Sequence, residues 1–370
     1  MVATHTDSLT RRNYVLDFLK LIFTFLVFFS HTSEFIGINT TISIPPLLGA
    51  TCVHFFYIIS GMMMIKSLSK YKGVDECGKN ALNFIVRKFK NLLPGYWIAL
   101  AITLIIHIYV YLRQGNVRVF SELMKFYPEI FALQYGGTFY NINPFAWYIS
   151  SMLICMLPLS YLCLRHRDFY VYVFAPTTAI LTFSYLVKTY NYFFGGTDDF
   201  NGLVIDGIIR AVCGICFGAI SYLVLSKFNE FTDKKKNRIT LTIVELVLWG
   251  VFFYSLLIER DRKVTMCGDF LILPTAIAVT TSGKSYVSDL FRFKWMKHLS
   301  SLSLAIYLCH RAAVRIVMEF FPDGSYKLCT SLMILFTALI CVLYYIIIFI
   351  IKKISEKRKT KKSDNTVNVG

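Results

Sequence analysis

The chain has 370 residues, of which 56% are hydrophobic and 16% aromatic, and its formal net charge at pH 7 is +17. A mean hydropathy of +0.56 excludes a water-soluble globular protein, because such a chain cannot bury this much apolar surface in a core of its own. Apolar runs of membrane-spanning length fill the sequence and leave no room for a separate soluble domain.

These apolar runs predict an all-α integral membrane protein with about ten transmembrane helices, since about 20 apolar residues cross a bilayer. The first apolar run comes directly after Arg11 and Arg12, and no small-residue cleavage site follows it. We therefore expect a signal anchor that is retained in the protein. The run that contains Pro274 is the shortest. The predicted spans cover residues 14–33, 47–66, 92–112, 144–164, 169–187, 204–226, 239–258, 268–282, 299–320 and 328–351.

The basic residues of the connections predict the orientation. If the N-terminus is inside, the inner segments hold 27 Lys and Arg and the outer ones 8. Positively charged connections stay in the cytoplasm, so both the N-terminus and the C-terminus are predicted to be cytoplasmic, in a plasma or inner membrane. The net charge then reflects topology, and no nucleic-acid partner is expected. Residues 1–352 form one transmembrane domain, and residues 353–370 form a basic cytoplasmic tail that we expect to be disordered.

The cysteines do not predict a disulfide framework, because all ten are scattered mainly through apolar segments, without paired spacing in any outward loop. Cys213 and Cys216 form a C-x-x-C beside Gly214 and Gly218 in an apolar helix, where packing of small residues is favoured over a redox or metal site. No zinc-protease, nucleophile-elbow or nucleotide-binding motif is present, so no metal is expected.

The first predicted helix carries ionisable residues, which are costly in lipid and therefore need a reason. Lys20 and His31 are eleven residues apart, about three turns, so they share a helix face about 16 Å apart along the axis. Glu34 follows His31 at i+3 and can orient it, raising the basicity of the imidazole. This arrangement suits the activation of a hydroxyl group, although His31 could equally hydrogen-bond a neighbouring helix.

Two further groups of residues allow either a functional or a structural interpretation. Arg87, Lys88 and Lys90 precede the third predicted span, where they can serve the inside orientation or bind the phosphates of a nucleotide-bearing ligand. Near the outer surface, aromatic and charged side chains can bind a sugar or mark the lipid boundary. This outer group comprises Trp147 together with Asp206 and Arg210, which are spaced i and i+4. His310, a further intramembrane histidine, is the fourth candidate for substrate binding.

Five short motifs resemble, in order, those of membrane acyltransferase family 3, whose multi-pass members O-acetylate polysaccharides and lipopolysaccharides. The first is L-D-x-L-R followed eleven residues later by histidine, with Lys20 here in place of the usual arginine. The other four are an F-F-x-x-S-G, an R-x-x-R-x-x-P-x-Y-W, a Trp-containing helix and an S-x-x-x-Y-L-x-H. This chain has one extra residue between Phe56 and Ser60 in the first of these, and one between Lys90 and Pro94 in the second. They match at Leu16, Asp17, Leu19, Lys20 and His31; Phe55, Phe56, Ser60 and Gly61; Arg87, Lys90, Pro94, Tyr96 and Trp97; Trp147; and Ser303, Tyr307, Leu308 and His310.

The resemblance implies transfer of an acyl group, commonly acetyl from acetyl-CoA, to a hydroxyl of a glycan or lipid-linked sugar beyond the membrane. His31 would be the base or a transient acyl carrier, with Lys20, Arg87, Lys88 and Lys90 holding the donor. No permanently bound cofactor is implied. Two other classes stay open: a transporter or flippase of a lipid-linked saccharide, whose charges would line a path, and an inactive membrane sensor.

Overall fold

The computed structural model describes residues 13–35, 47–71, 75–115, 118–134, 142–190, 204–232, 234–258 and 262–367. Within these ranges every regular element is helical and no strand occurs, as lipid requires of a chain whose backbone groups must be satisfied internally. The elements are α1 (Tyr14–Phe35), α2 (Leu47–Leu68), α3 (Cys77–Arg113), α4 (Val119–Lys125), α5 (Tyr127–Ile130), η1 (Pro144–Ala146), α6 (Trp147–Arg165), α7 (Arg167–Phe169), η2 (Tyr170–Phe174), α8 (Ala175–Thr189), α9 (Asp206–Glu230), α10 (Lys235–Leu257), α11 (Arg262–Ser282), α12 (Tyr286–Leu290), η3 (Lys294–His298), α13 (Leu299–Phe320) and α14 (Tyr326–Val367).

Nine helices of the described chain are long and apolar enough to cross a membrane, and each coincides with a predicted span. The remaining predicted span, 268–282, is the eighth in chain order and lies in α11. Its apolar part, Phe270–Ser282, is shorter than a full crossing, because the first turns of α11 carry Arg262, Lys263 and Asp269. The membrane-protein class and the helical fold are confirmed, whereas the count of ten and the side on which the termini lie stay predictions.

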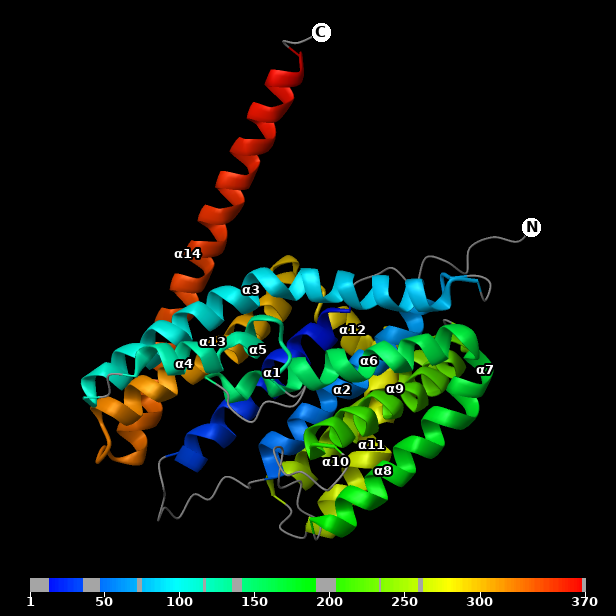
Figure 1. Ribbon diagram of the computed structural model, residues 1–370. Coiled ribbons are helices and arrows are strands. Elements are labelled where there is room, and N and C mark those ends of the chain that lie inside the picture. Colours follow the sequence, from blue (N-terminus) through cyan, green and yellow to red (C-terminus); the bar gives the residue numbers. More distant parts are fainter. Residues whose placement is uncertain are drawn as a thin grey trace.

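Two helices extend beyond their predicted spans. Helix α3 begins at Cys77, well before the predicted start at residue 92, and it bends along its length (Figure 1). It contains Pro94, and a proline inside a helix is a usual cause of such a bend. Its first turns bury Cys77, Ala81 and Phe84 at the i, i+4, i+7 spacing of an amphipathic helix. Helix α14 continues through the segment from residue 353, expected to be disordered, as far as Val367, because neither Gly nor Pro interrupts these residues.

The helices that enclose the centre of the bundle pack through aromatic rings and glycines. Phe23 of α1 stacks on Phe55 of α2, with ring centroids 3.8 Å apart. Helices α2 and α9 approach closely at Gly61, where a Cβ atom would lie 2.1 Å from the carbonyl oxygen of Ile215. Gly218 of α9 faces the backbone of α2 in the same way.

The cysteines of this region fit the packing interpretation. Cys213 and Cys216 are buried with free thiols on the α9 turns that carry Gly214 and Gly218. Cys155, Cys163, Cys309, Cys329 and Cys341 are also buried.

We predict that Gly61→Ala lowers the stability of the protein by about 1–3 kcal/mol or more, because the added methyl group must push α9 away from α2. Gly250→Ala on α10 is the matched control, since nothing lies within 4 Å of a Cβ at that position. The control should gain up to about 1 kcal/mol of helix propensity. Thermal unfolding in detergent measures both, and equal melting temperatures would contradict the close approach.

Candidate active site

A cavity of about 370 Å³ opens among α1, α2, α3, α6 and α13. Apolar side chains such as Phe56 and Met63 cover most of its wall. Its hydrogen-bonding groups include the hydroxyl of Ser60, which lies 3.1 Å from that of Tyr148. The cavity is therefore a mostly apolar pocket with a few placed polar groups, as small-molecule sites in proteins usually are.

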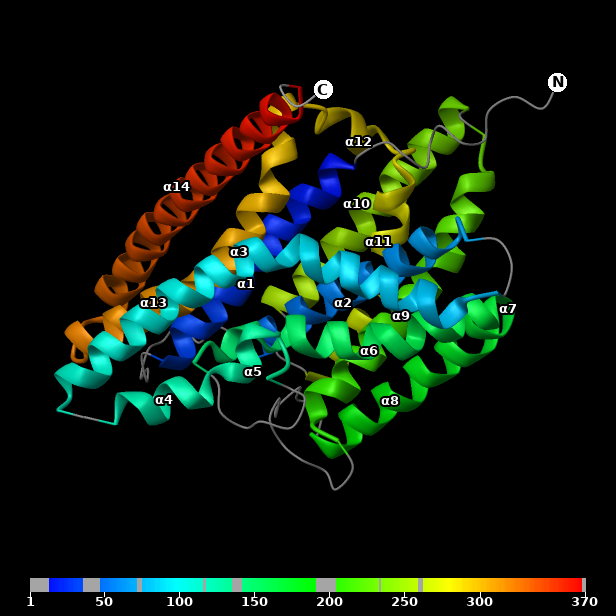
Figure 2. The ribbon, with the colours of Figure 1, turned by 45° about the horizontal axis from the view of Figure 1, so that its top comes forward.

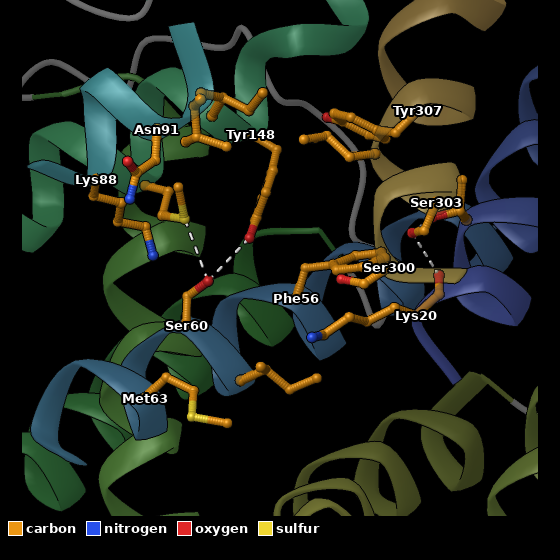
Figure 3. Close-up of a pocket in the computed structure, with 16 residues that line it drawn as sticks. Lys20, Phe56, Ser60, Met63, Lys88, Asn91, Tyr148, Ser300, Ser303 and Tyr307 are labelled. Carbon is orange, nitrogen blue, oxygen red and sulfur yellow. Dashed lines mark hydrogen bonds between the residues drawn. The ribbon is translucent and has the colours of Figure 1, made fainter. Parts of the chain in front are cut away.

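Two ammonium groups extend into this cavity from different helices. Lys20 on α1 and Lys88 on α3 both line it, and Figure 3 shows their side chains reaching in from opposite walls. Lys20 also pairs with Asp17 one turn earlier, at 3.3 Å between Nζ and Oδ1. Among the described residues, the two ammonium groups meet the carboxylate of Asp17, which leaves positive charge for an anionic ligand.

One face of α13 connects α1, the cavity and η1. Ser303 lies 2.7 Å from the hydroxyl of Thr24 and donates to the carbonyl of Lys20 at 3.1 Å. One turn later, Tyr307 lines the cavity and donates its hydroxyl to the carbonyl of Phe145. The i and i+4 spacing of this pair, with a third residue at i+7, places three motif residues on one side of the helix.

That third residue, His310, belongs to a group of three nearly parallel rings. His31 stacks on Phe145 with centroids 3.9 Å apart and planes inclined by 17°. Phe145 lies 4.7 Å from the ring of His310, and the two imidazoles lie 5.6 Å apart. We call His31, Phe145 and His310 the ring cluster.

Hydrogen bonding decides the tautomer of His310. Its Nδ1 lies 2.8 Å from the carbonyl oxygen of Tyr307 and 3.2 Å from that of Ile306. Both partners only accept, so Nδ1 carries the proton and Nε2 presents a lone pair. Nε2 is buried and has no hydrogen-bond partner among the described residues. The ring can therefore accept a hydrogen bond from a hydroxyl that enters the ring cluster.

The remaining residues expected to hold a donor are placed elsewhere. Arg87 and Lys90 are exposed on α3 and do not line the cavity, and Arg87 donates to the hydroxyl of Tyr71 at 3.2 Å. Glu34, expected to orient His31, lies in the last turn of α1, where its side chain is outside the described part of the structure. The structure thus brings Lys20 and Lys88 together, and His31 with His310.

Trp147, Asp206 and Arg210 form a separate group between α6 and α9. The guanidinium of Arg210 lies 5.2 Å from the ring centroid of Trp147, and Asp206, one turn earlier on α9, interacts with it electrostatically. Asp206 and Arg210 are each only 1% exposed, and none of the three lines the cavity. Their burial favours a structural role, and their part in acceptor binding stays a prediction.

Several residues of the site could not be recognised from sequence motifs alone. Phe145 appears as an ordinary apolar residue at the start of a span, and only its contact with His31 distinguishes it. Glu129 lies in a connection, on the four-residue helix α5, and is completely buried. The sequence does show a carboxylate among aromatic residues outside any predicted span, which could have marked Glu129 as unusual. Its hydrogen-bond partners could not be predicted, because they are set by tertiary contacts. No three His, Cys, Asp or Glu side chains of the described residues come together at metal-binding distance.

Comparison with known proteins identifies the family of the chain. A family model described as an acyltransferase domain matches residues 13–353, which is nearly the whole chain and includes every helix that lines the cavity. No curated protein and no solved structure matches the chain. The match begins just before α1 and ends within α14, so it includes both the cavity and the ring cluster. The chain is a multi-pass membrane protein that belongs to acyltransferase family 3.

Proposed function

We propose that this acyltransferase moves an acyl group, in the simplest case acetyl, from cytoplasmic acyl-CoA to a hydroxyl of a cell-envelope or exported glycan, with His31 as the general base. The observation that carries the proposal is the position of Tyr307, which lines the cavity and donates to Phe145 of the ring cluster. A donor whose phosphates meet Lys20 and Lys88 thereby has a reacting end close to His31.

The cavity suits the donor. Ammonium groups make charge-assisted hydrogen bonds to phosphate, which favours Lys20 and Lys88 as partners of the nucleotide end. Arg87 and Lys90, exposed on the same helix, add positive charge that attracts a polyphosphate toward α3. The apolar wall between the ammonium groups and Tyr307 suits the pantetheine arm and its acyl thioester.

The ring cluster suits the transfer. His31 takes the proton of the acceptor hydroxyl while the oxygen attacks the thioester carbonyl carbon. The carbon–sulfur bond then breaks, and the departing thiolate of coenzyme A takes the proton back from the imidazolium. His310, with its lone pair on Nε2, accepts a hydrogen bond from the acceptor and orients it. The thioester is itself an activated acyl group, so the reaction calls for no permanently bound cofactor.

We predict that His31→Gln lowers acyl transfer by about 10²–10⁴-fold, because glutamine can hydrogen-bond but cannot accept a proton. The measurement is mass spectrometry of envelope glycans from cells that lack the gene and carry the wild type or the variant at equal protein levels. His298→Gln, at an exposed histidine of η3, is the control and should keep the wild-type ester content. Undiminished esters in the His31 variant would refute His31 as the base.

We also predict that Lys88→Gln weakens acyl-CoA binding by about tenfold or more, because one charge-assisted hydrogen bond to phosphate is lost. A ligand that binds only the native state raises the melting temperature, so thermal protection by acetyl-CoA measures the affinity. Lys79→Gln is the matched control, since Lys79 is exposed on the same helix and pairs with Glu76. Equal protection of the variant, the control and the wild type would show that the donor binds elsewhere.

A further inference from the structure

Glu129 is a fully buried carboxylate that neither lines the cavity nor belongs to the ring cluster. It accepts hydrogen bonds from two consecutive backbone N–H groups. Ile142 donates to Oε1, and Asn143 donates to Oε2 at 3.1 Å. A carboxylate holding two adjacent amides fixes the path of the chain that carries them.

The helix that bears Glu129 is itself fixed to α3. The hydroxyl of Tyr96 donates to the backbone carbonyl of Glu129 at 2.8 Å, and Nε1 of Trp97 donates to the carbonyl of Ile130 at 2.8 Å. In the ribbon, α5 lies alongside α3 (Figure 2). The Tyr-Trp pair of the third helix therefore holds α5, and α5 holds residues 142 and 143.

The segment that Glu129 holds leads directly to the ring cluster. Two residues after Asn143, Phe145 lies 3.9 Å from the ring of His31. On the other side of the segment, the Asn143 side chain donates to the carbonyl of Leu308 on α13 at 3.4 Å. Arg311 of α13 faces both ends, with its guanidinium 5.1 Å from the Phe145 ring centroid and in electrostatic interaction with Glu129.

We propose that Glu129 is a positioning residue for acyl transfer: by holding the backbone of residues 142 and 143 it keeps the Phe145 ring against His31 and so orients the imidazole. The inference rests on the proposed function of His31 as the base. A reacting group displaced by about 1 Å can lose about 100-fold in rate, so a residue remote from the chemistry can control it.

The charge of Glu129 adds a pH dependence. Burial raises the pKa of its carboxyl to about 7, although the two backbone N–H groups and Arg311 oppose the rise. The titratable or charged groups that face it are Arg311 on α13 and Tyr96 on α3. Protonation near neutral pH replaces one accepting oxygen with a hydroxyl and loosens the segment. We therefore expect acid to release Phe145 and lower the rate.

Stability should change in the opposite direction. The pKa of Glu129 is higher in the folded protein than the ordinary value of 4.5, so the folded state binds the proton more tightly than the unfolded state. Protonated Glu129 therefore adds to the free energy of unfolding. This addition is fully present below the unfolded-state pKa of 4.5 and is lost as the pH rises through about 7. Acid thus stabilises this group in the fold while it weakens the positioning of His31.

The test compares Glu129→Gln with the wild type from about pH 5.5 to 8. Glutamine mimics the protonated carboxyl, so the variant should lose about tenfold or more in kcat at pH 8 with little change in the KM for acyl-CoA. The ratio of wild-type to variant rates should fall toward one near pH 5.5, and titration of His31 cancels in that ratio. As the pH falls from about 8 to 5.5, the melting temperature of the wild type should rise relative to that of the variant. Glu230→Gln, at an exposed ion pair of α9, should match the wild type throughout.

A rate ratio that is independent of pH, or a variant as fast as the wild type at pH 8, would overturn the proposal. A second readout needs no activity: amide hydrogen exchange of residues 142–146 at pH 8 should be faster in Glu129→Gln than in the wild type, and equal exchange also counts against positioning. Failure of the His31 variant's prediction would instead refute the proposed function. If Glu129→Gln does not fold, Phe145→Leu replaces it, and the ratio of wild-type to Phe145→Leu rates should show the same fall with acid. A constant ratio would overturn the proposal.

Discussion

Helix α1 is held against α13 by side-chain hydrogen bonds that lipid cannot replace. Ser303 reaches both the Thr24 hydroxyl and the carbonyl of Lys20. Bonds of this kind between membrane helices contribute only about 0.6–2 kcal/mol each, so their main effect is geometric. They restrict the rotation and sliding of α1, and α1 carries both Lys20 and His31. The relative position of the cavity and the ring cluster therefore depends on this contact with α13, together with the stacking of Phe23 of α1 on Phe55 of α2.

The motif residues on α13 and α3 fix different neighbouring segments of the site. On α13, Ser303 holds α1, Tyr307 holds the carbonyl of Phe145, and His310 completes the ring cluster. On α3, Tyr96 and Trp97 hold the backbone of α5 rather than touching the cavity. Most of these residues act on backbone carbonyls, so side chains substitute for the water that would satisfy such groups outside the membrane.

Patterns within single helices could be predicted from the sequence, whereas contacts between connections could not. The spacing of Lys20 and His31 placed both on one helix, and apolar runs located nine spans. The start of α3 was missed because its first turns are amphipathic rather than continuously apolar, although the spacing of Cys77, Ala81 and Phe84 carried that signal. Phe145 and Glu129 belong to no such pattern. Phe145 contacts His31 on α1 and His310 on α13, which are distant from it in sequence. Glu129 binds the backbone of Asn143 in the next connection.

The two ends of the site differ as the two proposed substrates differ. At the cavity, two ammonium groups with one neighbouring carboxylate favour a polyanionic donor. At the ring cluster, a lone pair on His310 and flat aromatic faces favour a neutral ligand that donates hydroxyl hydrogen bonds. Tyr307 touches both ends, with its ring centroid 6.0 Å from that of His310. Tyr307 therefore links the donor end of the site to the acceptor end, which the proposed reaction requires to be adjacent.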